Sequence, residues 1–156
     1  MSNESSRAEL IAALSAALRE ASGQGVLCSQ AAAERLGVNS TDLECMGYLV
    51  AGPMSAGALS QATGLTTGAI TGVIDRLERA GYARRERHPG DRRKVLVSLT
   101  PLAAERAQPV FAPMEEAVGE VLATYDDAQL ALLLTFLRRM RDVSVAVIGQ
   151  FSRSPP

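Results

Sequence analysis

The stretch between residues 66 and 99 restricts the fold more than any other part of the chain, because its apolar period changes there. Up to residue 80 the apolar residues recur at helical spacing, and after residue 94 they alternate with their neighbours. They are Ile70, Val73, Ile74 and Leu77 in the first part, and Val95, Val97 and Leu99 in the second. The pattern predicts a helix with one face on a core, followed by a half-buried strand.

A shorter helix is predicted directly before this one. Residues 55–62 are typical of a short helix, and Thr63-Gly64-Leu65 is typical of a tight turn. Thr66 is expected to cap the second helix, which runs to Ala80 and ends at Gly81. A short helix, a turn that contains Gly and a second helix together predict a helix-turn-helix.

The alternating segment is expected to form one strand of a hairpin. Its partner is predicted at Tyr82–Arg87, and the loop His88-Pro89-Gly90-Asp91 has Pro and Gly where a type II turn prefers them. Thr100 is expected to cap a further helix with Pro101 at its first position. A helix-turn-helix followed by a two-stranded hairpin, here called the wing, is a winged helix.

Three helices are predicted before the helix-turn-helix. The first spans Arg7–Ala21 and is expected to break at Gly23-Gln24-Gly25, and a short helical stretch follows at Ser29–Leu36. Ser40 is expected to cap the third, which Gly52-Pro53 stops. The predicted apolar face of this third helix consists of Leu43, Met46, Leu49 and Val50.

The last helix carries the longest apolar seam. It is predicted to begin at Asp126, which with Gln129 resembles a capping box. The seam has spacings of 3 and 4 over three heptads and consists of Leu130, Leu133, Leu137, Met140, Ser144, Val147 and Phe151. Such a seam needs a partner helix, although a helix packed inside its own monomer shows a similar stripe.

A homodimer is the prediction that follows, because the helix-turn-helix and the wing already need a core of their own. Residues 7–22 and 101–151 are predicted to be the dimerisation helices, and residues 29–100 the winged helix-turn-helix region. The expected interface residues are Leu10, Leu14, Leu130, Leu133, Leu137, Met140, Val147 and Phe151.

Positive charge is concentrated in the wing and the helix before it. The window Arg76–Lys94 holds eight basic and three acidic residues, a net charge of +5, whereas the rest of the chain holds eight basic and 14 acidic residues, a net charge of −6. Such a patch suggests an anionic partner, although a solvated Arg-rich hairpin would look the same. Fifteen of the 16 basic residues are Arg, which favours nucleic acid modestly.

Length and composition exclude several classes of protein. The 156 residues fit one domain, and a hydrophobic content of 47% is enough for a core. The longest apolar stretch, Leu130–Leu137, is far shorter than the roughly 20 residues that span a bilayer. The N-terminal residues do not resemble a secretion signal, so we expect a cytoplasmic protein without membrane contact.

Catalytic and metal sites are not expected either. The sequence has one His and no Gly-x-Ser-x-Gly or phosphate-cradling motif, so an enzyme is not predicted, and neither is a cofactor. His88 lacks the further ligands that zinc requires. Cys45 is expected to be a buried, inert thiol, whereas Cys28 keeps a chance of reactivity, which leaves a thiol-based redox sensor as an alternative.

The winged helix predicts how DNA would be bound. The second helix of the motif offers its N-terminal residues to the major groove, and the wing reaches the minor groove and the backbone. In the helix these residues are Thr66, Thr67, Gly68, Ala69, Thr71 and Gly72, with Arg76 placed for phosphates. In the wing they are Arg87, His88, Asp91, Arg92, Arg93 and Lys94.

The segment from Gly64 to Tyr82, followed by Asp91-Arg92-Arg93 and Leu99-Thr100-Pro101, resembles the MarR family of bacterial transcription regulators. The resemblance covers nearly the whole chain. It implies a mainly α fold with a small β-hairpin wing and N- and C-terminal dimerisation helices. It also implies that Asp91 orients Arg93 by a salt bridge and that Arg93 enters the minor groove. The chain departs from many members at positions 67 and 72, where Thr and Gly replace longer polar or basic side chains.

By the same resemblance, the protein is expected to be a homodimer that binds a pseudo-palindromic operator in double-stranded DNA. A repressor released by a small amphipathic or phenolic ligand is the expected function, with the ligand between the dimerisation helices and the winged region. A winged helix that binds protein instead of DNA is the other alternative, and salt dependence distinguishes the two.

Overall fold

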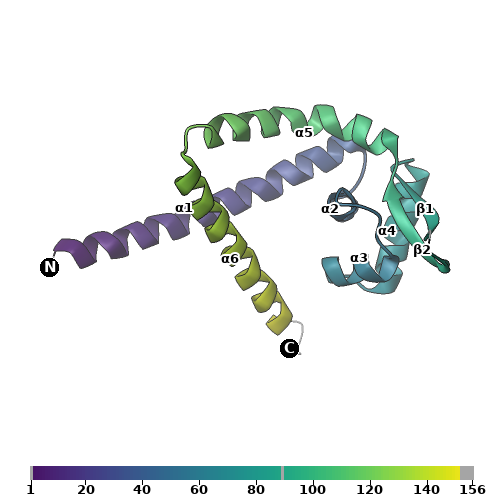
Figure 1. The fold of residues 1–156 in the computed structure, drawn as a ribbon, viewed down its shortest axis with the longest axis horizontal. Helices are drawn as coiled ribbons and strands as arrows, with labels where there is room; N and C mark the ends of the chain where they lie inside the picture. The colour runs from purple at the N-terminus through teal and green to yellow at the C-terminus, as the bar shows by residue number, and fades with distance from the viewer. Residues whose placement is uncertain (1, 89, 152–156) are drawn as a thin grey trace. The chain divides into compact units, whose positions relative to one another are not determined.

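The computed structural model describes residues 2–88 and 90–151, and the side chains of residues 6–87, 90–91 and 95–150 within them. The chain forms two compact units, Met1–Phe111 and Ala112–Pro156. The predicted fold class is confirmed: the described residues form helices and one antiparallel hairpin. In chain order (Figure 1) the elements are α1 (Ser2–Leu36), α2 (Ser40–Leu49), α3 (Ala56–Thr63), α4 (Thr67–Arg79), β1 (Ala83–His88), β2 (Asp91–Leu99), α5 (Pro101–Leu122) and α6 (Asp127–Phe151).

The helix-turn-helix forms as predicted, because its ends are set by local caps. The Ser55 hydroxyl accepts a hydrogen bond from the Ala58 amide at the start of α3, and the Thr66 hydroxyl accepts one from Ala69 at the start of α4. Gly64 ends α3 in the left-handed conformation, with φ of 73°, which a residue without Cβ adopts readily. The sequence prediction of both helices is confirmed.

The wing is a two-stranded antiparallel hairpin. Its register pairs Ala83 with Leu99 and Arg87 with Val95, and it shifts between Arg87 and His88. Pro89 lies outside the described residues, so the predicted turn type is not tested. The expected alternation in β2 is wrong in part, because Val97 and Ser98 are both buried whereas Val95 is exposed. Val95 is exposed because it lies beyond the point where the hairpin leaves the core.

One hydrophobic core holds the winged region together. Residues of α2, α3, α4 and the hairpin meet in it, and Ala103 joins them from the first turn of α5. The Tyr82 hydroxyl donates a hydrogen bond of 2.8 Å to the Leu36 carbonyl and so ties the end of α1 to the base of the wing. The largest fully buried side chains are Leu59, Ile70, Ile74, Leu77, Val73, Val97 and Cys45.

The predicted break near residue 24 is wrong, since α1 continues from Ser2 to Leu36. Each Gly lowers helix stability by about 1 kcal/mol, which the Ala-rich flanks and the burial of Ala32, Ala33 and Leu36 offset. The helix ends instead at Gly37, with φ of 69°.

The predicted start and apolar face of the next helix also need correction. Asn39, and not Ser40, caps α2, because its side chain accepts a hydrogen bond of 2.8 Å from the Asp42 amide. Val50, predicted on the apolar face, is exposed. The buried positions of α2 are Asp42, Cys45, Met46 and Leu49.

The last two helices start at the predicted caps. The Thr100 hydroxyl accepts a hydrogen bond from the Ala103 amide at the start of α5. At the start of α6, Oδ1 of Asp126 accepts from the Gln129 amide at 2.8 Å and Oε1 of Gln129 accepts from the Asp126 amide at 2.9 Å, which confirms the capping box. Among the described residues, no helix is long and apolar enough to cross a membrane.

Candidate nucleic-acid interface

The N-terminal half of α4 presents a small, polar face to solvent. Residues 66–69 and Thr71 are exposed, whereas Ile70, Val73 and Ile74 on the opposite face are buried. This amphipathic division fixes which face of the helix a partner can contact. A Cβ added to Gly68 would meet no atom within 4 Å, so the protein's own packing does not require glycine there.

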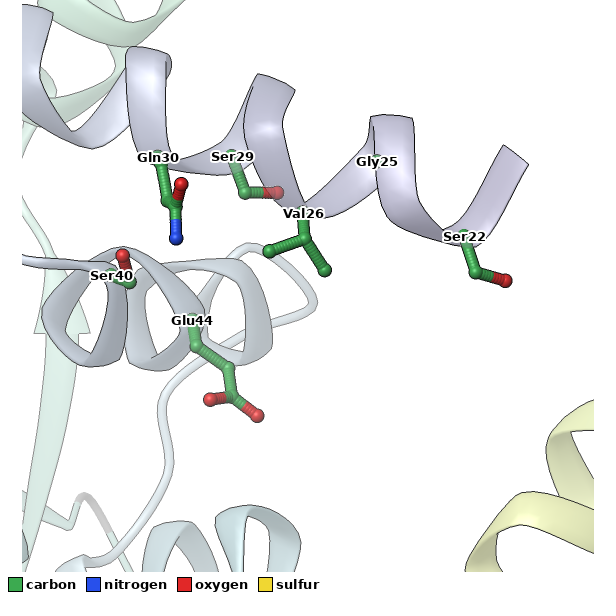
Figure 2. Close-up of a pocket in the computed structure, with 7 residues that line it drawn as sticks. All are labelled: Ser22, Gly25, Val26, Ser29, Gln30, Ser40 and Glu44. Atoms are coloured by element: carbon green, nitrogen blue, oxygen red, sulfur yellow. The ribbon is translucent and has the colours of Figure 1, made fainter. Parts of the chain in front are cut away.

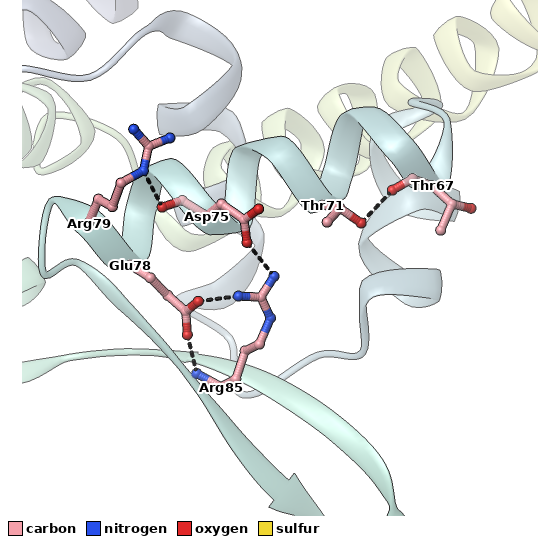
Figure 3. Close-up of polar contacts among 6 residues, drawn as sticks. All are labelled: Thr67, Thr71, Asp75, Glu78, Arg79 and Arg85. Atoms are coloured by element: carbon pink, nitrogen blue, oxygen red, sulfur yellow. Dashed lines mark hydrogen bonds and ion pairs between the residues drawn. The ribbon is translucent and has the colours of Figure 1, made fainter.

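Two hydroxyl groups on this face are already engaged within the helix. The Thr66 hydroxyl accepts from the Ala69 amide, and the Thr71 hydroxyl donates to the Thr67 carbonyl at 2.9 Å (Figure 3). The Thr71 oxygen keeps its lone pairs and its methyl group remains exposed. It can therefore accept a hydrogen bond or contact an apolar group of a partner.

Arg76 has an acidic partner, Asp42, that was not predicted from the sequence. Its Nε donates to both carboxylate oxygens of Asp42, at 3.1 and 3.0 Å, and its Nη2 donates to Oδ1 at 2.6 Å. Asp42 is buried in α2, whereas the Arg76 side chain is half-exposed. The hydrogen bonds to Asp42 raise the pKa of Arg76. This ion pair fixes α4 against α2, so Arg76 is primarily bound inside the protein.

Arg85 of β1 binds two acidic residues of α4 (Figure 3). Its Nη2 donates to Oδ1 of Asp75 at 2.7 Å, its Nη1 pairs with Oε2 of Glu78, and its backbone amide donates to Oε1 of Glu78 at 2.9 Å. The hydrogen bond to Asp75, together with the charge of Glu78, raises the pKa of Arg85. Arg85 thus joins the base of the wing to the outer face of α4.

The predicted wing residues follow in β1 and β2. Arg87 is exposed, and Asp91 is partly buried. The side chains of His88, Arg92, Arg93 and Lys94 lie outside the described ones, so the predicted salt bridge between Asp91 and Arg93 stays a prediction. The backbone of these residues belongs to the two strands, which places all six wing residues on the hairpin.

The two cysteines occupy opposite environments. Cys45 is fully buried, and this burial, with the nearby charges of Glu44 and Asp42, raises its pKa to about 11. The prediction of a buried thiol is confirmed. Cys28 is exposed on α1. Among the described residues, no three His, Cys, Asp or Glu side chains form a group that could hold a metal ion.

A groove of about 490 Å³ runs between α1 and α2 (Figure 2). Val26 supplies an apolar side chain, whereas Gln30 and Glu44 supply polar groups at its edge. Its volume lies in the range of small-molecule sites, roughly 300–1,000 Å³. Five of its seven lining residues carry polar side chains and all seven are exposed, so the groove is open to solvent. The full lining is Ser22, Gly25, Val26, Ser29, Gln30, Ser40 and Glu44.

The predicted dimer residues are largely exposed in the single chain. In the unit Met1–Phe111, Leu10 and Leu14 lie exposed on α1. In the unit Ala112–Pro156, Leu137 is 57% exposed and Val147 37%, and the Phe151 side chain is outside the described ones. Leu130, Leu133 and Met140 are half-buried.

Asp42, Asp75 and Arg85 were not among the predicted site residues. For Asp42 a signal was available, since positions 42, 45, 46 and 49 form one buried helical stripe and a charge within such a stripe needs a partner. For Arg85 no local signal exists, because its contacts join residues of a helix and a strand.

Comparison with known proteins agrees with this architecture. The sequence profile of the MarR family matches residues 36–94. The chain is 38% identical over 144 residues to YcgE of Bacillus subtilis, an uncharacterized HTH-type transcriptional regulator, and the match covers 92% of this chain and 94% of YcgE. It is 30% identical over 92 residues to the HTH-type transcriptional repressor NicR of Pseudomonas putida, which is 58% of each chain.

A solved structure has the same fold. It is a MepR variant of S. aureus bound to an oligodeoxyribonucleotide, with a TM-score of 0.57, 16% identity, and coverage of 83% of this chain and 96% of that one. The winged helix-turn-helix, the profile match and the full-length similarity to YcgE lead to one conclusion. The chain is a DNA-binding transcriptional regulator, not an enzyme, and it belongs to the MarR family.

Proposed function

We propose that the protein is a homodimeric repressor that binds a pseudo-palindromic operator and is released by a small ligand. The observation that carries the proposal is the exposed polar face of α4 beside a basic wing. The similarity to NicR, which is named a repressor, supports this direction of regulation. Such a protein acts on the chromosome, and we therefore assign it to the cytoplasm.

The proposed DNA contacts divide between α4 and the wing. Thr67, Gly68 and Thr71 approach base edges in the major groove, where Thr can bond either base partner or contact a thymine methyl. Arg93, oriented by Asp91, enters the minor groove. Phosphate contacts come from the other wing residues, Arg87, His88, Arg92 and Lys94. Thr66, Ala69 and Gly72 allow the helix to approach closely, and Arg76 mainly holds α4 in place.

The dimer proposal follows from unsatisfied apolar surface. Leu10 and Leu14 on α1, and Leu137 and Val147 on α6, are exposed in the single chain, although each belongs to a regular helical stripe. Burying such side chains contributes about 25 cal/mol per Å² of apolar area. A second copy of the chain supplies an identical seam, as a two-fold interface requires.

The ligand proposal rests on the groove between α1 and α2. A small amphipathic or phenolic molecule would place its ring near Val26 and its polar group near Gln30 or Glu44. Because α2 also carries Asp42, a shift of α2 would be passed to α4 through Arg76. Occupation of the groove is therefore proposed to lower operator affinity.

A redox sensor is less well supported than ligand control. Cys45 is buried with a pKa of about 11, so it is almost entirely a neutral thiol at physiological pH. Cys28 is the exposed thiol. If Cys28 acted as the sensor, Cys28→Ser would abolish a peroxide-dependent loss of DNA binding.

Fluorescence anisotropy tests the DNA proposal directly. The protein is titrated against the DNA upstream of its own gene and against a scrambled duplex, at several salt concentrations. Tight, salt-sensitive binding with preference for the native duplex is expected, since phosphate contacts release counterions. Salt-insensitive binding to a protein partner, with equal weak binding to both duplexes, would instead favour an interaction module.

A further inference from the structure

The wing leaves the core at Arg85. This residue pairs in register with Val97, which is buried and exchanges two backbone hydrogen bonds with Met54, at 3.0 and 2.7 Å. Two residues further along the hairpin, Arg87 and Val95 are both exposed. Arg85 therefore stands at the boundary between the anchored and the protruding parts of the wing.

Three polar contacts join this boundary to α4. The Arg85 guanidinium bridges Asp75 and Glu78, which lie one turn apart on the same face of the helix, and its backbone amide also binds Glu78. A bridging, planar guanidinium fixes direction as well as distance. By contrast, Arg84 pairs at 3.3 Å with Glu86 of its own strand, a contact that ties nothing to α4.

We propose that Asp75, Glu78 and Arg85 form a clamp that sets the angle between the wing and α4. These are positioning residues for DNA binding. An isolated two-stranded hairpin is only marginally stable, so its direction depends on contacts at its base. Its tip lies three residues beyond Arg85, about 10 Å at 3.3 Å per residue. A small rotation at Arg85 thus displaces the basic tip from the groove that it must enter.

A simple charge effect of Asp75 and Glu78 and the proposed clamp predict opposite changes in DNA affinity when the two residues are neutralised. If Asp75 and Glu78 are only negative charges beside DNA, removing them strengthens binding, because repulsion of phosphates is lost. If they hold Arg85, removing them weakens binding although the protein becomes more positive. The sign of the change separates the two explanations.

The test compares Asp75→Asn/Glu78→Gln with the parent in operator binding by fluorescence anisotropy. The expected result is affinity about tenfold weaker, within the range that one ion-pair network contributes. Glu86→Gln is the matched control, since it removes an acidic residue from the wing without touching the clamp, and it is expected to bind at least as tightly as the parent. Stronger binding by the double variant would overturn the clamp.

The variant Arg85→Lys tests the clamp without a change in net charge. Lys cannot bridge both carboxylates in a planar geometry, so operator binding is expected to weaken while its dependence on salt stays the same. Parental affinity in Arg85→Lys would contradict the proposal. This variant decides the matter even where the double variant fails to fold.

Hydrogen exchange provides a readout that does not involve DNA. Backbone amides of residues 83–87 and 95–99 are expected to exchange faster in the double variant, whereas those of α2 and α3 stay unchanged. The clamp proposal rests on the proposed DNA binding by the winged region. Hydrogen exchange tests the clamp separately from DNA binding. Absence of DNA binding by the parent would overturn the proposed function, whereas unchanged exchange in the hairpin would overturn the clamp.

Discussion

Asp42 of α2 and Arg76 of α4 form the ion pair that fixes α4 on its neighbour α2. They are 34 residues apart in the chain, and the buried carboxylate accepts three hydrogen bonds from the guanidinium. A buried carboxylate without a partner is costly, so the position of α4 depends on this pair.

Replacing Arg76 by Ala should destabilise the fold. The buried Asp42 carboxylate would lose its partner, which is expected to lower the free energy of unfolding by about 1–3 kcal/mol. Urea unfolding measures the change. Arg79→Ala is the control on the same helix, since Arg79 is exposed, and a change within about 0.5 kcal/mol is expected there. Equal losses in both variants would refute a special role for Arg76.

The two thiols should differ strongly in reactivity. Cys28 is exposed and is expected to react with a thiol reagent in the folded protein, whereas Cys45 should react only after denaturation. Counting alkylated thiols by mass spectrometry at pH 8 tests this. Rapid modification of both thiols in the folded state would contradict the burial of Cys45.

The raised pKa of the buried Cys45 thiol predicts a loss of stability at high pH. Cys45 ionises near pH 9.0 when unfolded and at about 11 when folded, so the folded state favours the protonated form. The contribution of the Cys45 thiol to the free energy of unfolding is therefore complete below pH 9.0 and is lost as the pH rises to about 11. Urea unfolding of Cys45→Ala and parent should show a smaller decline for the variant over this interval. Parallel declines would exclude Cys45 as the cause.

Thr71→Ala should reduce sequence preference more than general affinity. The hydroxyl and methyl groups of Thr71 lie on the exposed face of α4, where they can contact base edges. Anisotropy on operator and random duplexes gives the ratio of affinities, which is expected to fall. Thr135→Ala is the matched control, because Thr135 on α6 makes the same bond to the carbonyl four residues earlier. Equal losses on both duplexes would refute base reading.

Arg93→Ala should weaken binding to all duplexes and reduce the salt slope by about 1, because a cation in the minor groove also displaces counterions from the DNA. Arg141→Ala on α6 serves as the control, since Arg141 is bound to its neighbour Asp142. The anisotropy titration is repeated over a range of salt. A variant that binds like the parent would remove Arg93 from the interface.

Leu137→Glu should produce monomers in sedimentation velocity, because a charge in the centre of the seam would be buried without a partner. Leu132→Glu is the matched control on the same helix, as Leu132 is 70% exposed and lies off the seam. Only the first variant is expected to shift toward monomer. An intact dimer in Leu137→Glu would exclude the seam as the interface.

The order of the elements was readable from the sequence because each boundary depends on nearby residues. Ser55, Thr66 and Thr100 cap helices through amides three residues away, and Asp126 and Gln129 do the same reciprocally. Such contacts form between neighbours in sequence, so residue types alone predict them. The apolar period likewise predicted which face of α4 is buried.

Tertiary structure decided what no local pattern contains. The continuity of α1 through Gly23 and Gly25 was missed, because a modest loss of helix propensity is offset by packing at the end of the helix. Arg76 and Arg85 were indistinguishable from other basic residues in the sequence, yet each binds acidic side chains inside the winged region. A charge acquires its role from the groups that folding brings near it, since electrostatic attraction depends on distance in space and not on separation along the chain.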